Sequence, residues 1–243
     1  MIPVFRKIRK KMADDNKPLK YMRYAIGEII LVVIGILIAL QVNTFNNKRK
    51  RIKLEEKILH EIEINLSGDI VDVQDELESF NIVMQDDSIL IQHFQLKRPF
   101  NDSIGAYLHI FQMSPHLSPA RSGYKLLESK GIDLISSDSL RMQITALYEI
   151  SYPYYFTYAD ERFQMVETLI QPYLTKYFYI EKYHKWPYFK RMPMDYNLLL
   201  NDPGLISLIQ TSSYHASVMS RKSVNLKSEI ETLQNQIRIY LGM

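Results

Sequence analysis

The chain has 243 residues, 47% of them apolar, which is enough to bury the core of one ordinary domain and makes extensive disorder unexpected. The net charge of +3 is small, yet eight of the 30 Lys and Arg residues precede Tyr24, and this local basicity favours a membrane surface over nucleic acid as a partner. Cysteine is absent, which excludes disulfides, thiolate metal sites and a cysteine nucleophile.

Residues 1–23 form a basic segment that is amphipathic when drawn as a helix. Its apolar residues Ile2, Phe5, Ile8 and Met12 then share one face, and cations occupy the rest of the surface. Such a helix is expected to lie on an anionic cytoplasmic leaflet, and a solvated basic tail is the alternative. The residues expected to anchor the segment at the membrane surface are Phe5, Arg6, Lys7, Ile8, Arg9, Lys10 and Lys11.

Residues 24–44 are predicted to form a transmembrane helix. Glu28 is the single ionisable residue between Tyr24 and Val42, and at about 1.5 Å per residue this stretch reaches roughly 28 Å, the thickness of a hydrocarbon core. A cleaved signal peptide is the competing interpretation, but a basic cluster follows the apolar stretch directly, without a small-residue cleavage site. Both flanks are basic, so charge only leans toward a cytoplasmic N-terminus, which the amphipathic segment also favours.

One face of this helix combines the carboxyl group with small residues. Gly35 and Ala39 are four residues apart, a spacing that lets a second helix approach closely. Self-association is therefore expected, with a homo-oligomer interface formed by Glu28, Leu31, Gly35, Ala39 and Val42. The alternative is that Glu28 extends toward the headgroups and the small residues are incidental.

Two stretches resemble known sequences. The stretch from Tyr24 to Asn43 resembles the N-terminal block of an uncharacterised family of small membrane proteins in Bacteroidota, and residues 122–141 are similar to a recurrent helical segment in such domains. The resemblance implies a Bacteroidota cell envelope and supplies no activity, substrate or site residue.

Residues 45–243 are predicted to be a helical soluble domain, so the whole chain is expected to be all-α. A long helix is expected at about 46–97, shorter helices at 101–180 with an interruption at Pro153, a loop at 184–202 and a long last helix at 203–241 capped by Asp202. The two long helices most simply pack antiparallel in a bundle, although the last one could instead pair with its copy. The buried face of the first is expected to contain Leu59, Ile62, Leu66, Ile70, Val73, Leu77, Phe80 and Met84.

No motif predicts a catalytic residue, a cofactor or a metal. Glu56, His60 and Glu63 share a helix face that could bind a metal if another helix added ligands, but a solvated charged face is the preferred interpretation. The aromatic stretch 148–196 could fill a core or present a partner surface. The candidate surface residues are Tyr154, Tyr155, Tyr183, Trp186 and Tyr188.

These features predict a single-pass protein of the inner membrane with a cytoplasmic N-terminus and a periplasmic C-terminal domain. We expect a non-enzymatic binding, sensory or scaffolding module with the lipid bilayer, a homo-oligomer and an envelope protein as partners, and no nucleic acid. The alternatives are an oligomeric pore or ion-coupled device that uses Glu28, and an unrecognised hydrolase formed by scattered carboxylates.

Overall fold

The computed structural model describes residues 18–243 and divides the chain into two units, residues 1–54 and residues 55–243. Residues 1–17 of the expected amphipathic segment, which include all of its anchor residues from Phe5 to Lys11, therefore lie outside the described residues. Helix α2 (Pro18–Gln95) contributes to both units.

The described part of unit 1 is an isolated stretch of α2 that is long and apolar enough to cross a membrane. Every large apolar side chain from Ile26 to Phe45 is exposed, and none of the most apolar window is buried within the protein. A soluble protein rarely exposes so continuous an apolar surface, because water contact with apolar groups is unfavourable.

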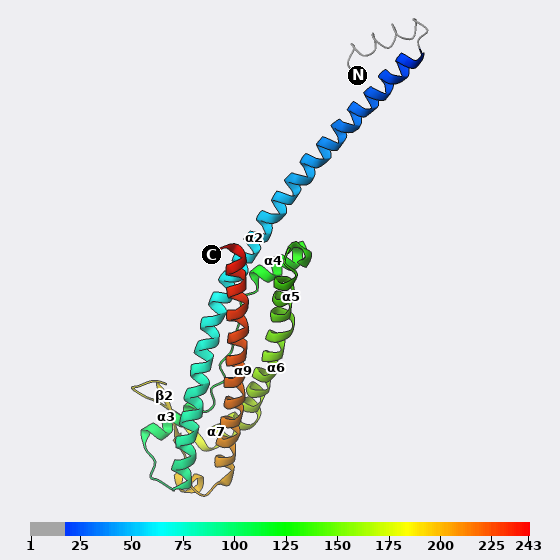
Figure 1. Cartoon of the computed structure of the whole chain (residues 1–243). Coiled ribbons are helices and arrows are strands. Elements are labelled where there is room, and N and C mark those ends of the chain that lie inside the picture. The colour runs from blue at the N-terminus through cyan, green and yellow to red at the C-terminus, as the bar shows by residue number, and fades with distance from the viewer. Residues whose placement is uncertain (1–17) are drawn as a thin grey trace. The chain divides into compact units, whose positions relative to one another are not determined.

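Unit 2 is built on the remainder of α2 and on the last helix, α9 (Pro203–Leu241), which pack antiparallel as expected (Figure 1). Side-chain bonds join Asn81 to Ser220 and Gln74 to Lys227. Further along, Gln234 bonds to Ser67 and Arg238 to Glu63. The residue numbers of the partners therefore rise along α9 as they fall along α2, which is the order of an antiparallel pair. The pairing of α9 with α2 thus occurs within one chain.

A third helical layer, which runs alongside α9, completes the bundle (Figure 1). It consists of α5 (Asp138–Ala146), η2 (Leu147–Ser151), α6 (Tyr152–Met165), η3 (Val166–Ile170) and α7 (Gln171–Tyr177). The interruption expected at Pro153 does not occur, because the layer continues through this residue as helix. Helices α6 and α7 each have a proline in the first turn, and each directly follows a wide π turn, η2 or η3. Proline has no amide hydrogen, and the first turn of a helix accommodates it for that reason.

Shorter elements fill the connection between α2 and α5. They are α3 (Asp102–Ile110), α4 (Ser122–Lys130) and η1 (Ile132–Leu134). The expected cap Asp202 is confirmed, because its side chain accepts a hydrogen bond from the amide of Gly204 at the start of α9. Asn101 and Ser137 cap α3 and α5 in the same way.

The expectation of an all-α chain is wrong at residues 178–193. Strands β1 (Phe178–Lys182) and β2 (Phe189–Pro193) form an antiparallel hairpin, followed by the short helix α8 (Tyr196–Leu199), where the end of a helix and the loop 184–202 were expected. The aromatic residues of this stretch favour the extended backbone, and the hairpin pairs Phe178 with Pro193 and Lys182 with Phe189.

Candidate functional site

The buried face of α2 in unit 2 contains carboxylates as well as apolar side chains. One row of its buried residues follows alternating steps of four and three, typical of helices packed in a bundle: Glu55, Leu59, Ile62, Leu66, Asp69, Val73, Glu76, Phe80, Val83, Asp87, Leu90 and Phe94. Ile70, Leu77 and Met84, which were expected on this face, are only half-buried. Four acidic groups therefore lie in this row, and Glu63 and Asp86 beside it are buried as well.

Asp69 has a partner for each carboxyl oxygen. The Tyr152 hydroxyl donates a hydrogen bond of 2.5 Å to Oδ2, and the amide of Ala120 donates one of 2.9 Å to Oδ1. Burial raises the pKa of Asp69, and these two hydrogen bonds lower it in part. Asp69 thus connects α2 with α6 and with the segment that leads to α4.

Glu76 lies in a chain of hydrogen bonds that needs three protons. Its Oε2 contacts the Tyr155 hydroxyl, which lies 2.9 Å from the Ser223 hydroxyl, and Ser223 donates to the carbonyl of Met219. Tyr155 and Ser223 supply only two protons for these three contacts, so all three are satisfied when Glu76 is protonated. Burial correspondingly raises the pKa of Glu76, whose Oε1 is buried without a partner.

Asp87 is fully buried, and neither of its carboxyl oxygens accepts a hydrogen bond. Arg162, also fully buried, directs its guanidinium to the carbonyls of Met113 and Ser212, at 2.6 to 3.1 Å. Burial raises the pKa of Asp87 to about 7, although the nearby Ser212 hydroxyl and the charge of Arg162 oppose that shift. Burial likewise raises the pKa of the neighbouring Asp86 to about 6.

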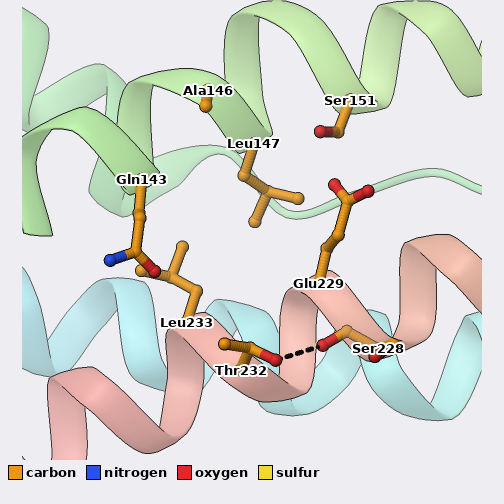
Figure 2. A pocket seen from close by; sticks show the side chains of 8 residues that line it. All are labelled: Gln143, Ala146, Leu147, Ser151, Ser228, Glu229, Thr232 and Leu233. Carbon is orange, nitrogen blue, oxygen red and sulfur yellow. Dashed lines mark hydrogen bonds between the residues drawn. The ribbon is translucent and has the colours of Figure 1, made fainter.

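A surface groove lies between the α5–α6 layer and α9. It consists of two adjoining pockets with volumes of about 210 and 250 Å³ that share Ser151 and Glu229. Figure 2 shows Leu147 and Leu233 approaching each other from the two helices, with the Glu229 carboxylate directed toward Ser151. The first pocket is therefore mainly apolar, with polar groups at its margin.

The second pocket is linked to the buried carboxyl group of Glu76 through Tyr155. Tyr155 lines it while bonding to Glu76 and Ser223 in the core. At its other side, the Lys222 ammonium donates a 2.8 Å hydrogen bond to the Tyr154 hydroxyl and lies over the rings of Tyr154 and Tyr158. This contact lowers the pKa of Tyr154. A molecule in this pocket would touch Tyr155, the only side chain of the set that also reaches Glu76.

The structure divides the five expected surface aromatics among three places. Tyr154 borders the groove, whereas Tyr183, Trp186 and Tyr188 belong to the hairpin. Tyr155 is almost fully buried, so it belongs mainly to the core although it lines the second pocket. The aromatic stretch thus supplies both the core and exposed surfaces.

The suggested metal face is divided as well. Glu63 is buried and accepts hydrogen bonds from Arg238 and Gln234, whereas Glu56 and His60 are exposed. Residues 18–243 contain no cluster of three His, Asp or Glu side chains placed to hold a metal ion.

Sequence reasoning missed Asp69, Glu76, Asp87 and Arg162, because it took charged residues on a helix to face water. The four-and-three alternation that begins at Leu59, Ile62 and Leu66 would have found the acids if it had been continued without regard to polarity.

Comparisons with known proteins give no match: neither a family model, nor a curated protein, nor a solved structure is similar to this chain.

Proposed function

We propose that this chain is a single-span protein of a cell envelope, whose helical unit 2 binds a partner or ligand outside the cytoplasm. The observation that carries the proposal is the continuous exposed apolar surface of α2 between Ile26 and Phe45, which lipid would cover. The basic residues before Tyr24 support a cytoplasmic N-terminus, and the likeness of residues 24–43 to a Bacteroidota family supports the envelope.

Binding is favoured over catalysis by the way in which the core polar groups are used. Asp69 and Glu76 are bonded to tyrosine hydroxyls, and Arg162 is bonded to backbone carbonyls, so these groups hold helices together. The groove offers apolar area with a small number of polar groups at its margin, which is the usual composition of a binding site. Through Tyr155 an occupant of the groove would contact the network around Glu76, as expected of a sensory module.

The location of unit 2 can be tested by labelling, because the chain has no cysteine. A single cysteine introduced as Tyr214→Cys, at an exposed position of α9, gives one unique thiol. We expect a membrane-impermeant maleimide to label it once the outer membrane is permeabilised and the inner membrane is intact. Labelling only after the inner membrane is broken would place unit 2 in the cytoplasm and contradict the proposed orientation.

A further inference from the structure

The hairpin leaves one strand edge without a partner. Two backbone hydrogen bonds, one at each end of the hairpin, identify which opposite residues are hydrogen-bonded pairs. The amide of Tyr183 donates to the carbonyl of Tyr188, and the amide of Met194 donates to the carbonyl of Tyr177. In an antiparallel pair, bonded and non-bonded positions alternate, so Ile180 and Lys182 direct their amides and carbonyls away from β2. Within residues 18–243 the sheet has only two strands, so no third strand pairs with this outer edge of β1.

The opposite edge of the hairpin is covered. A Cβ atom on Gly105 of α3 would lie 2.8 Å from the carbonyl oxygen of Arg191, so α3 approaches the outer side of β2 at backbone distance. The Lys190 ammonium also binds Asp102 of α3 at 2.6 Å. The hairpin is thus held to unit 2 through β2, which leaves the β1 edge accessible.

The surroundings of this edge are aromatic and basic. Trp186 is 50% exposed and Tyr188 is 63% exposed, and Tyr179, Ile180 and Phe189 are exposed as well. The one acidic side chain of the two strands, Glu181, lies 3.3 Å from Lys190, whereas Lys182 and Lys185 are exposed and form no ion pair with a described carboxylate. The edge therefore combines unpaired backbone groups with apolar area and two uncompensated positive charges.

We propose that the outer edge of β1 binds an extended, acidic segment of a partner protein, which adds to the hairpin as a third strand. Strand addition satisfies the amides and carbonyls of Ile180 and Lys182, and acidic side chains of the added strand complement Lys182 and Lys185. The exposed aromatics supply the apolar contact that a short strand needs. This inference rests on the proposal that unit 2 is a binding module and names one surface and one chemistry for it.

The chain contains its own probe for this surface, because Trp186 is its only tryptophan. The full chain in detergent is titrated with a capped peptide of alternating glutamate and valine, and binding is followed by Trp186 emission and by calorimetry. We expect saturable binding that weakens with salt, and no binding of the matching lysine and valine peptide. Failure of the acidic peptide to bind in both measurements would overturn the proposal.

Two substitutions of Ile180 distinguish a peptide that pairs with the backbone of β1 from one that is held only by side-chain charge. Ile180→Pro removes an amide that points outward and leaves the bonded pairs with β2 in place, and Ile180→Val retains that amide. We expect Ile180→Pro to weaken peptide binding roughly fivefold or more, because one hydrogen bond is lost and a carbonyl of the peptide is left unpaired, whereas Ile180→Val binds as the native chain does.

Other outcomes identify other occupants and contradict the proposal. Equal affinity of the two Ile180 variants would exclude strand addition. A change in Trp186 emission on adding anionic vesicles alone would indicate a lipid surface, and a change with protein concentration alone would indicate a second copy of the chain. These results do not depend on membrane insertion of α2, so failure here is distinguishable from failure of the proposed function.

Discussion

At the scale of single residues, the core of unit 2 contains carboxyl groups whose ionisation is unfavourable. Asp87 ionises near pH 3.8 in an unfolded chain and near pH 7 in the folded one, because burial disfavours the charged form. The folded chain therefore binds this proton more tightly. The stability that follows is complete below about pH 4 and is lost as the pH rises through 7.

We predict that Asp87→Asn reduces this pH dependence. An amide of the same shape has no charge to bury, so the variant should lose less stability than the native chain between pH 4 and pH 8, by up to about 4 kcal/mol. The measurement is urea unfolding of the full chain in detergent at both pH values. Asp75→Asn, at an exposed position of α2, is the control and should keep the native pH dependence. An unchanged pH dependence in Asp87→Asn would show that Asp87 is charged in the fold.

The residues around these acids show what the sequence could and could not predict. The positions of the caps could be predicted, since Asn101, Ser137 and Asp202 act on amides two or three residues away. The burial of Glu76 and Asp87 could not be predicted in the same way, because Tyr155, which contacts Glu76, and Arg162, whose charge acts on Asp87, lie far along the chain. Long-range pairing of polar groups leaves no local pattern.

At the scale of elements, α4 packs against α2 at unusually short distance. A Cβ atom on Gly123 would lie 2.8 Å from the backbone nitrogen of Ile62, and the neighbouring Asn65 side chain accepts a hydrogen bond from the Gly123 amide. Backbone cannot yield as a flexible side chain can, so only glycine is accommodated here.

We predict that Gly123→Ala lowers the free energy of unfolding by about 1–3 kcal/mol, since α4 must move away from α2. Gly68→Ala is the matched control, because a Cβ at this exposed position of α2 meets nothing within 4 Å. It should stabilise the chain by about 0.5–1 kcal/mol through the higher helix propensity of alanine. Both effects are measured by urea unfolding in detergent, and equal effects of the two substitutions would contradict the close packing.

The helix periodicity in the sequence predicted the two long helices and their antiparallel packing, but not the hairpin. Leu59, Ile62 and Leu66 on α2 and the regular face of α9 repeat over many turns, and such repetition survives local irregularities. Strands β1 and β2 are only five residues long each, and β2 is held by α3 from another part of the chain. Short elements fixed by tertiary contacts have too little local pattern to be recognised.

The apolar helix allows a test of self-association. A Cβ atom at Gly35 or at Gly27 meets nothing within 4 Å, so either glycine can become leucine without a clash inside one chain. We predict that Gly35→Leu weakens the oligomer in detergent and that Gly27→Leu, about a quarter turn around the helix, does not. Light scattering coupled to size-exclusion chromatography measures the mass. If Gly35→Leu keeps the native mass, the interface does not include Gly35 and Ala39.

At the scale of the whole molecule, the two units differ in how their apolar side chains are covered. Unit 2 buries its apolar side chains against one another, whereas the apolar side chains of unit 1 from Ile26 to Phe45 are exposed. The transfer of such side chains from water to an apolar surrounding is favourable by about 1.5–3 kcal/mol for each large one. This free energy supports the proposal that lipid covers the stretch.

Alkaline carbonate extraction of membranes that contain the full chain tests this most directly. We predict that the protein stays in the membrane pellet, and that a variant with two lysines in the apolar stretch, Val33→Lys with Leu37→Lys, is released to the supernatant because charge in the bilayer centre is costly. Recovery of the native chain in the supernatant, soluble without detergent, would contradict the account.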